Sequence, residues 1–221
     1  MIKRILIVGI GSIGKRHLGL ARELLPESEI AVLRHSADSI IPDGADHIYF
    51  TMEDALAFSP ELAVIANPSS FHLSAAMPLA EAGVHLLIEK PMSSTSEGVK
   101  NLIEVCKKTN SVLAVGYNLR FLPSLQQFRA LINGKTIGKV ISVRCEVGQY
   151  LPSWRPDTDY RQTVSANAAL GGGVLLELSH EFDYLRWLFG EVDWVKATLS
   201  QQSDLELDVE DTAHLTLGFE P

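Results

Sequence analysis

The chain has 221 residues, of which 46% are hydrophobic and 21% are charged, a balance typical of a globular protein with one large domain or two small ones. Its formal net charge of −8 argues against nucleic acid or an anionic membrane as a main partner. Cys106 and Cys145 are the only cysteines and form no metal-spaced cluster. Because no stretch approaches the roughly 20 apolar residues of a membrane span, we expect a cytoplasmic protein with reduced thiols, no metal and no membrane partner.

The first segment with a clear pattern is residues 4–25. Residues 5–8 are a continuous apolar run, which predicts a strand buried on both faces of a parallel sheet. Gly9, Gly11 and Gly14 follow in the spacing G-x-G-x-x-G, and the residues after them carry an apolar helical stripe. A lone glycine pattern can be an ordinary turn. The strand before it and the helix after it favour dinucleotide binding.

Each residue of this turn has a separate expected role. Gly9 allows the tight turn, Gly11 lets a pyrophosphate approach the backbone, and Gly14 lets the helix pack closely on the strand. Ser12 and Ile13 complete the turn, where the free N–H groups at the helix start would face the phosphates.

Strand and helix patterns alternate through the rest of the first half. This alternation predicts right-handed βαβ units and a doubly wound parallel sheet, the α/β arrangement known as the Rossmann fold. The expected strands are residues 29–33, 45–50, 61–66, 84–88 and 112–115, and the expected helices are 51–58, 70–82 and 95–108. Thr51 and Asp54 resemble a capping box at the start of the first of these helices.

After about residue 118 the pattern changes, so we divide the chain into a dinucleotide-binding domain, 1–118, and a second domain, 119–221, to which the resemblance described below assigns substrate binding and dimerisation. The second domain is expected to be α+β with an open, largely antiparallel sheet. The expected elements are helices at 123–132 and 171–188, strands at 139–147, 193–201 and 212–219, and a long irregular stretch at 150–169. Loops of that length are often functional.

The residue at the end of the second strand discriminates between dinucleotides in such folds. A carboxylate there binds the ribose 2′-hydroxyl, whereas an arginine suits a 2′-phosphate. This chain has Arg34 and then His35, with no acid before Asp38. NADP(H) is therefore the favoured cofactor, with NAD(H) possible. The alternative is a solvated loop arginine.

Polar residues also follow the fourth and fifth strands, at the sheet edge where ligands bind. Asn67, Pro68 and His72 follow the fourth strand, and Glu89 and Lys90 close the fifth. We expect them to line the cofactor, with Lys90 over the nicotinamide, where it could stabilise a developing alkoxide. A capped helix with a satisfied surface histidine, and a surface lysine, are the alternatives.

Glu177 and His180 are three residues apart on the expected helix 171–188 and would share a face. Glu177 could orient His180, whose neutral imidazole is a suitable base for a hydroxyl proton. The alternative is a capped helix with one buried histidine. A metal site would need further ligands that the sequence does not indicate.

Five motifs in order along the chain resemble the Gfo/Idh/MocA family of oxidoreductases. They are GIGSIG at 9–14, ANPSSFH at 66–72, EKP at 89–91, GYNLRF at 116–121 and GGGVLLELSHEFD at 171–183. The resemblance implies a catalytic role for Lys90, an acid/base role for His180 with Glu177 as its carboxylate, and cofactor contacts from Asn118 and Arg120. The family's carboxylate is commonly an Asp four residues before the histidine, whereas here it is a Glu three before.

The resemblance implies an NAD(P)-dependent oxidoreductase acting on a secondary hydroxyl or carbonyl of a sugar, polyol or nucleotide-sugar. It also implies a homo-oligomer formed through the second-domain sheet, and a second domain that is incomplete, because family chains usually continue further. A non-catalytic dinucleotide-binding sensor or scaffold is the alternative. The expected substrate residues are Tyr150, Trp154, Arg155, Tyr160 and Arg161, for which a packed surface loop is the alternative.

Overall fold

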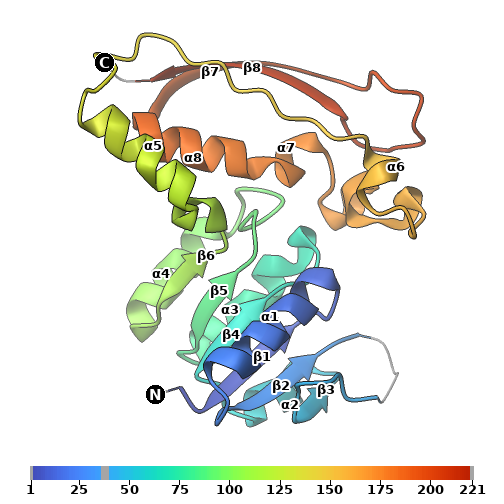
Figure 1. Cartoon of the computed structure of the whole chain (residues 1–221). Helices are drawn as coiled ribbons and strands as arrows, with labels where there is room; N and C mark the ends of the chain where they lie inside the picture. Colours follow the sequence, from blue (N-terminus) through green and yellow to red (C-terminus); the bar gives the residue numbers. More distant parts are fainter. Residues whose placement is uncertain (1, 36–39, 220–221) are drawn as a thin grey trace. The chain divides into compact units, whose positions relative to one another are not determined.

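The computed structural model describes residues 2–35 and 40–219, which form two compact units, Met1–Gly116 and Tyr117–Pro221 (Figure 1). The boundary lies two residues before the one expected from the sequence. Asp38 lies outside the described residues. Each unit is described by itself below.

The first unit is built on a six-stranded parallel sheet in the order β3-β2-β1-β4-β5-β6. The strands are β1 (Arg4–Val8), β2 (Glu29–Leu33), β3 (His47–Tyr49), β4 (Leu62–Ile65), β5 (His85–Ile88) and β6 (Leu113–Val115). This order is that of a Rossmann sheet, in which ligands bind at the carboxyl ends of the strands where the order reverses, here between β1 and β4. The predicted doubly wound sheet is confirmed.

The helices of the first unit are α1 (Ser12–Leu24), α2 (Met52–Ala57), α3 (His72–Glu81) and α4 (Val99–Thr109), with a short 3-10 turn, η1 (Ser69–Phe71). The Oγ1 atom of Thr51 accepts a hydrogen bond from the backbone N–H of Asp54 at 3.1 Å, which confirms the predicted N-cap of α2. The structure places the start of α4 four residues later than expected, because Gly98 before it has a φ of 77°, outside the helical range.

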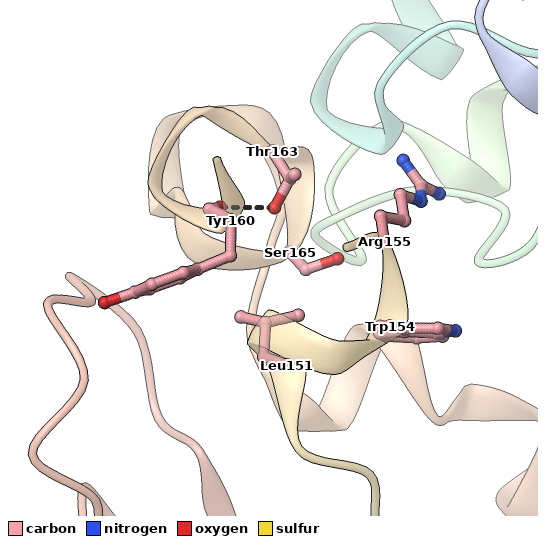
Figure 2. A pocket seen from close by; sticks show the side chains of 6 residues that line it. All are labelled: Leu151, Trp154, Arg155, Tyr160, Thr163 and Ser165. Atoms are coloured by element: carbon pink, nitrogen blue, oxygen red, sulfur yellow. Dashed lines mark hydrogen bonds between the residues drawn. The ribbon is translucent and has the colours of Figure 1, made fainter. Parts of the chain in front are cut away.

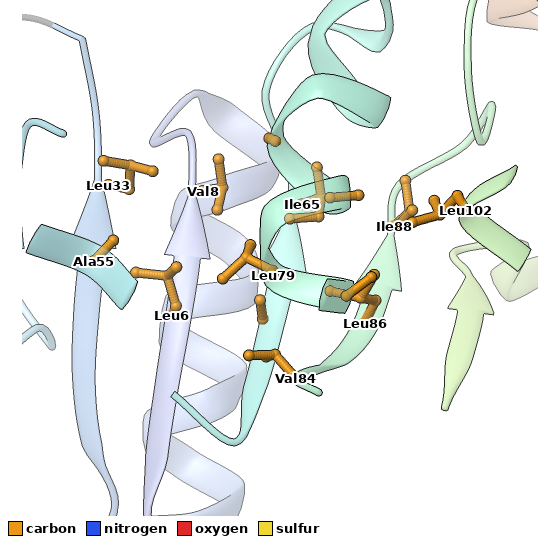
Figure 3. Close-up of a cluster of buried hydrophobic side chains, with 14 of the residues drawn as sticks. Leu6, Val8, Leu33, Ala55, Ile65, Leu79, Val84, Leu86, Ile88 and Leu102 are labelled. Atoms are coloured by element: carbon orange, nitrogen blue, oxygen red, sulfur yellow. The ribbon is translucent and has the colours of Figure 1, made fainter. Parts of the chain in front are cut away.

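Hydrophobic side chains cover both faces of this sheet. Leu6 and Val8 belong to the cluster that contains Leu79 of α3 and Leu102 of α4 (Figure 3). The alternate positions of β1 face the other cluster, which includes Leu18 of α1. Each fully buried aliphatic side chain stabilises the fold by roughly 1.5–3 kcal/mol. The continuous apolar strands in the sequence are therefore explained by burial on two faces.

The second unit combines short helices with an antiparallel pair of strands. Its elements are η2 (Asn118–Phe121), α5 (Pro123–Asn133), α6 (Leu151–Trp154), η3 (Tyr160–Gln162), η4 (Val164–Ala166), η5 (Ala168–Leu170), α7 (Val174–Glu177), α8 (Ser179–Phe189), β7 (Val192–Ser200) and β8 (Thr212–Phe219). In the register of β7 and β8, Val195 lies opposite Leu217. Among the described residues, no helix is long and apolar enough to span a membrane.

The strand predicted at 139–147 is wrong. In the structure this segment forms no helix or strand, and Ile141 is 92% exposed. The segment contacts α8, where the Sγ atom of Cys145 lies 2.8 Å from the hydroxyl oxygen of Tyr184. Alternating hydrophobicity indicates a surface with two unlike faces, but a strand also needs a partner, and among the described residues of the second unit only β7 and β8 pair.

The single helix predicted at 171–188 is also wrong. The backbone of Leu178, with φ −99° and ψ 27°, separates α7 from α8. Glu177 therefore ends one helix, whereas His180 lies in the first turn of the next. Their spacing of three residues does not place them on one helical face, as the sequence suggested.

Candidate active site

The glycine turn after β1 is closely packed at two positions and open at the third. Gly9 has a φ of +87°, and a Cβ there would lie 2.8 Å from the backbone nitrogen of Asn67. A Cβ at Gly14 would lie 2.1 Å from the carbonyl oxygen of Gly9. By contrast, a Cβ at Gly11 would meet nothing within 4 Å. The fold thus requires two of the glycines, and the third borders open space beside the start of α1.

This open space suits an anionic group. Gly11 is the N-cap residue of α1 and has no side chain to occupy the first N–H groups, and the first turn contains no acidic residue. Ser12 and Ile13 supply the backbone N–H groups of that turn. Free amides and the positive end of the helix dipole favour a phosphate there. The residues present therefore fit the pyrophosphate of a dinucleotide.

Arg34 lies directly after β2, the strand next to β1. Its backbone N–H donates to the carbonyl of Tyr49 at 3.1 Å, and the N–H of Gly9 donates to Leu33 at 2.9 Å, so the end of β2 is tied to both neighbouring strands. Arg34 is half-buried and His35 is exposed. The structure places both at the edge of the sheet that carries the glycine turn.

His72 joins the segments that follow β4 and β5. Its ring is 1% exposed, and its Nε2 and Nδ1 atoms lie 2.8 Å and 2.9 Å from the carbonyl oxygens of Asn67 and Pro91. Burial lowers the pKa of His72 more than these two carbonyls raise it. Both nitrogens are thus directed at backbone carbonyl oxygens, and the neutral imidazole, which has a single N–H, donates to one of them. The histidine is buried, whereas the alternative placed it on the surface. The Lys90–Pro91 peptide bond that follows β5 is cis.

Glu89 is held by protein groups at the end of β5. Its Oε1 atom accepts a hydrogen bond from the Nε2 atom of His17 at 2.6 Å, and its Oε2 atom accepts one from the backbone N–H of Lys90 at 3.2 Å. Burial raises the pKa of Glu89. The bonds from His17 and from the Lys90 N–H together lower that pKa by more than burial raises it, so it lies below the usual value. Our reading of the sequence missed His17. The available signal was its position three residues after Gly14, on the same face of α1.

The residues of the last motifs lie in the second unit. The rings of His180 and Tyr117 meet edge to face, with centroids 5.7 Å apart and planes at 76°. Burial raises the pKa of Tyr117. The Oε1 atom of Glu177 accepts a hydrogen bond from the hydroxyl of Ser165 at 3.0 Å. The structure therefore gives His180 an aromatic neighbour that the sequence did not indicate.

Arg120 forms a two-pronged ion pair with Asp183. Its Nε and Nη2 atoms donate to the two carboxylate oxygens at 2.8 Å and 2.7 Å, which ties η2 to α8. Two of its donors are thus used within the protein, while Asn118 on the same turn is exposed. The cofactor contacts expected of both residues stay predictions. Among the described residues, no three His, Cys, Asp or Glu side chains are grouped so as to hold a metal.

The segment after residue 150 encloses a small hollow (Figure 2). It is lined by Leu151, Trp154, Arg155, Tyr160, Thr163 and Ser165. Its volume is about 230 Å³ including the solvent open to it, below the roughly 300–1,000 Å³ of sites that bury a small ligand. The hollow alone is therefore smaller than the usual binding site of a small molecule.

Three of the five expected substrate residues line this hollow, and two do not. Tyr150 is 63% exposed. The guanidinium of Arg161 is paired with Asp159 at 2.9 Å and with Glu206 at 3.0 Å. These ion pairs raise the pKa of Arg161.

Comparison with known families gives two adjoining matches. Residues 3–117 match a family described as an oxidoreductase family with an NAD-binding Rossmann fold. Residues 125–221 match the GFO/IDH/MocA C-terminal domain.

Comparison with individual proteins gives similar results. The chain is 31% identical over 192 residues to the rhizopine catabolism protein MocA of Rhizobium meliloti, covering 85% of this chain and 57% of that protein. It is 32% identical over 142 residues to levoglucosan dehydrogenase of Pseudarthrobacter phenanthrenivorans, covering 62% of this chain and 35% of that protein. The crystal structure of GenD2 from gentamicin A biosynthesis, in complex with NAD, superposes with a TM-score of 0.82 at 27% identity, covering 99% of this chain and 62% of that one. The chain thus spans between a third and two thirds of the length of these proteins.

Proposed function

The chain belongs to the GFO/IDH/MocA family of oxidoreductases, and we propose that it transfers a hydride between a nicotinamide dinucleotide and a secondary hydroxyl or carbonyl of a sugar, polyol or nucleotide-sugar. The observation that carries this proposal is the joining of three strand ends. Gly9 after β1 packs on Asn67 after β4, and His72 links Asn67 to Pro91, the neighbour of Lys90. A dinucleotide on the turn and a lysine for the substrate oxygen thus share one sheet edge.

The cofactor half of the proposal rests on the turn. The open space at Gly11 receives the pyrophosphate, and the first N–H groups of α1 bind it. When bound, the nicotinamide supplies the hydride chemistry. The chain's own residues hold the dinucleotide and manage the proton.

For the cofactor we infer a preference for NADP(H), with Arg34 pairing with the 2′-phosphate. Such charge-assisted contacts contribute about 1.5–3 kcal/mol, or roughly tenfold to over a hundredfold in affinity. Calorimetric titration of both oxidised cofactors checks this, with Arg34→Asp expected to invert the preference. Tighter binding of NAD than of NADP by the parent chain contradicts the inference and leaves NAD(H) as the cofactor.

Lys90 and His180 are the proposed catalytic residues. The ammonium of Lys90 donates a hydrogen bond to the substrate oxygen and stabilises the charge that develops there. The imidazole of His180 takes the hydroxyl proton during oxidation, with its ring oriented by the edge contact with Tyr117. Glu177, the last residue of α7, accepts a hydrogen bond from Ser165. We therefore assign Glu177 a role in positioning His180 rather than in the proton transfer itself.

The substrate residues are assigned to the segment around the hollow. Trp154 and Tyr160 provide aromatic faces for the apolar side of a sugar ring, and Arg155 provides donors for its hydroxyls. The named relatives act in rhizopine catabolism and on levoglucosan, which supports a sugar-like substrate. Absorbance of the reduced nicotinamide, followed over a panel of sugars, polyols and nucleotide-sugars, tests the whole proposal. Cofactor binding without turnover on any of them assigns the chain to the sensor or scaffold class instead.

We also propose that a second copy covers the exposed face of the second-unit sheet. Val195 and Leu199 of β7 are 60% and 47% exposed and lie on one face of the strand, four residues apart. Sedimentation of the parent and of Val195→Glu measures this, with dissociation expected in the variant.

A cytoplasmic location fits Cys106 and Cys145, which are both free thiols in the structure.

A further inference from the structure

A partly buried pair of side chains connects α1 to the end of β5. His17 and Glu89, 72 residues apart in sequence, are bonded at 2.6 Å with side-chain exposures of 18% and 15%. We propose that His17 and Glu89 are positioning residues that couple the glycine turn to Lys90. This inference rests on the proposed function, since it assigns Lys90 as the residue being positioned.

Glu89 occupies a junction of three segments. One carboxylate oxygen is bonded to His17 of α1, and the other accepts the backbone N–H of Lys90. On a third side, a Cβ at Gly116 after β6 would lie 3.1 Å from the carboxylate. The carboxylate therefore cannot move without breaking its bond to the backbone N–H of Lys90 or its bond to His17 of α1.

His17 places this junction within reach of the cofactor site. It lies three residues after Gly14, which has no room for a side chain against Gly9. Because the start of α1 is the proposed phosphate site, a movement of that helix reaches Glu89 through His17. Removing one partner of a partly buried, hydrogen-bonded pair leaves the polar group of the other without its bond, so we expect the two residues to act as one unit.

The first test measures the backbone of Lys90 directly in the cofactor-free chain. Amide hydrogen exchange at Lys90 is followed by NMR in the parent, His17→Gln, Glu89→Gln and the double variant. We expect exchange at least about tenfold faster in each single variant, and no faster in the double variant than in the faster single. Unchanged exchange at Lys90 in both single variants overturns the proposal.

The chain offers a matched control on the same helix. Arg22, in the last turn of α1, is paired with Asp46 at 2.6 Å, and the further hydrogen bonds of this pair go to the backbone of Pro26, Ser28, Ile30 and Gly44. Asp46→Asn should lower the unfolding temperature without changing exchange at Lys90. If Asp46→Asn accelerates that exchange as much as His17→Gln does, the effect is general loosening of the unit and the proposal fails. Should His17→Gln not fold, Glu89→Gln carries the same comparison.

The second test uses turnover. At saturating cofactor, each single variant should lower kcat about tenfold while the dissociation constant of the cofactor changes less than about threefold, and the double variant should be no slower than the slower single. If the two fold-losses in kcat multiply in the double variant, His17 and Glu89 act independently and the proposed coupling is wrong. If the parent turns over no substrate, the proposed function fails, and the exchange experiment alone decides the pair.

Discussion

At the scale of single residues, Lys90 is the position on which the proposed chemistry depends most. Replacing it with alanine removes a donor to the developing oxyanion, and removal of comparable donors costs roughly 2.7–4 kcal/mol, or about 10²–10³ in kcat. We expect Lys90→Ala to lose that much turnover while binding the cofactor almost normally, as measured by steady-state kinetics and calorimetry. Lys100→Ala, which alters an exposed lysine of α4, is the control. A comparable loss in the control, or normal turnover in Lys90→Ala, contradicts the assignment.

His180 is expected to show a different pattern. His180→Asn keeps a polar side chain next to Tyr117 but cannot accept the proton, so oxidation should slow by about 10²–10⁴-fold. The matched control is His214→Asn, at an exposed position of β8. Stopped-flow measurement of the hydride step, with cofactor and substrate saturating, separates this loss from binding. If the hydride step in His180→Asn is as fast as in the parent, His180 is not the base and another residue must accept the proton.

Residue positions could be predicted where a role follows from neighbouring sequence, and not where it follows from a distant partner. The packed glycines, Gly9 and Gly14, were identified from their spacing and are confirmed by the contacts a Cβ would make. The pairing of His17 with Glu89 joins residues 72 apart, and that of Arg120 with Asp183 joins residues 63 apart. Spacing along one helix or strand cannot indicate such partners, because only the fold brings them together.

At the scale of elements, the turn and α1 give three glycine variants with different expected effects. Gly14→Ala places a Cβ 2.1 Å from a backbone oxygen, so we expect a lower unfolding temperature and weaker cofactor binding together. Gly11→Ala meets nothing within 4 Å, so it should fold as well as the parent but bind the cofactor at least about tenfold more weakly. Gly19→Ala, in the middle of α1 with open space around it, is the control and should raise stability by about 0.4–1 kcal/mol. Thermal unfolding and calorimetry on the three variants measure these stabilities and affinities. Unimpaired cofactor binding by Gly11→Ala would contradict the placement of the phosphate at Gly11.

The elements of the first unit were the easier ones to predict. Each of its strands lies in a sheet covered on both faces, so a short apolar run between turns marks it, and the helices follow between. In the second unit, residues 139–147 alternate like a strand but have no partner, and α7 and α8 are separated at Leu178 although the apolar pattern continues through it. Both errors have one physical cause: tertiary contacts, absent from a local pattern, decide whether an element forms and where it breaks.

At the scale of the whole molecule, the two units differ in the probes they contain. Trp154, Trp187 and Trp194 all lie in the second unit, so tryptophan fluorescence reports on that unit alone. Circular dichroism reports on both, because both contain helices. Unfolding of the first unit can therefore be followed as the part of the dichroism change that fluorescence does not show.

Acid should destabilise the first unit before the second. Burial lowers the pKa of His72 below its ordinary value of 6.5, so the unfolded chain binds more protons than the folded one as the pH falls below 6.5. The stability linked to His72 is full above pH 6.5 and is lost toward its folded pKa, with a slope of at most about 1.4 kcal/mol per pH unit. In the second unit, Asp159 and Asp211 have a pKa below their ordinary value of 3.8, so the stability linked to these two carboxylates is lost only at a more acid pH than that linked to His72.

The measurement is the unfolding temperature between pH 7 and pH 5, followed by both probes in the parent and in His72→Gln. The glutamine can still donate to the carbonyl of Asn67 but does not titrate, so the variant should be less stable at pH 7 and its unfolding temperature should change less with pH. His85, half-buried on β5 and outside the His72 contacts, gives the control variant His85→Gln, which should keep the parent's slope. If His72→Gln keeps the parent's full pH dependence between pH 7 and pH 5, protonation of His72 is not its cause and the assignment is wrong. Glu89 cannot replace it as the cause, because its pKa lies below the ordinary value of 4.5, outside the measured range.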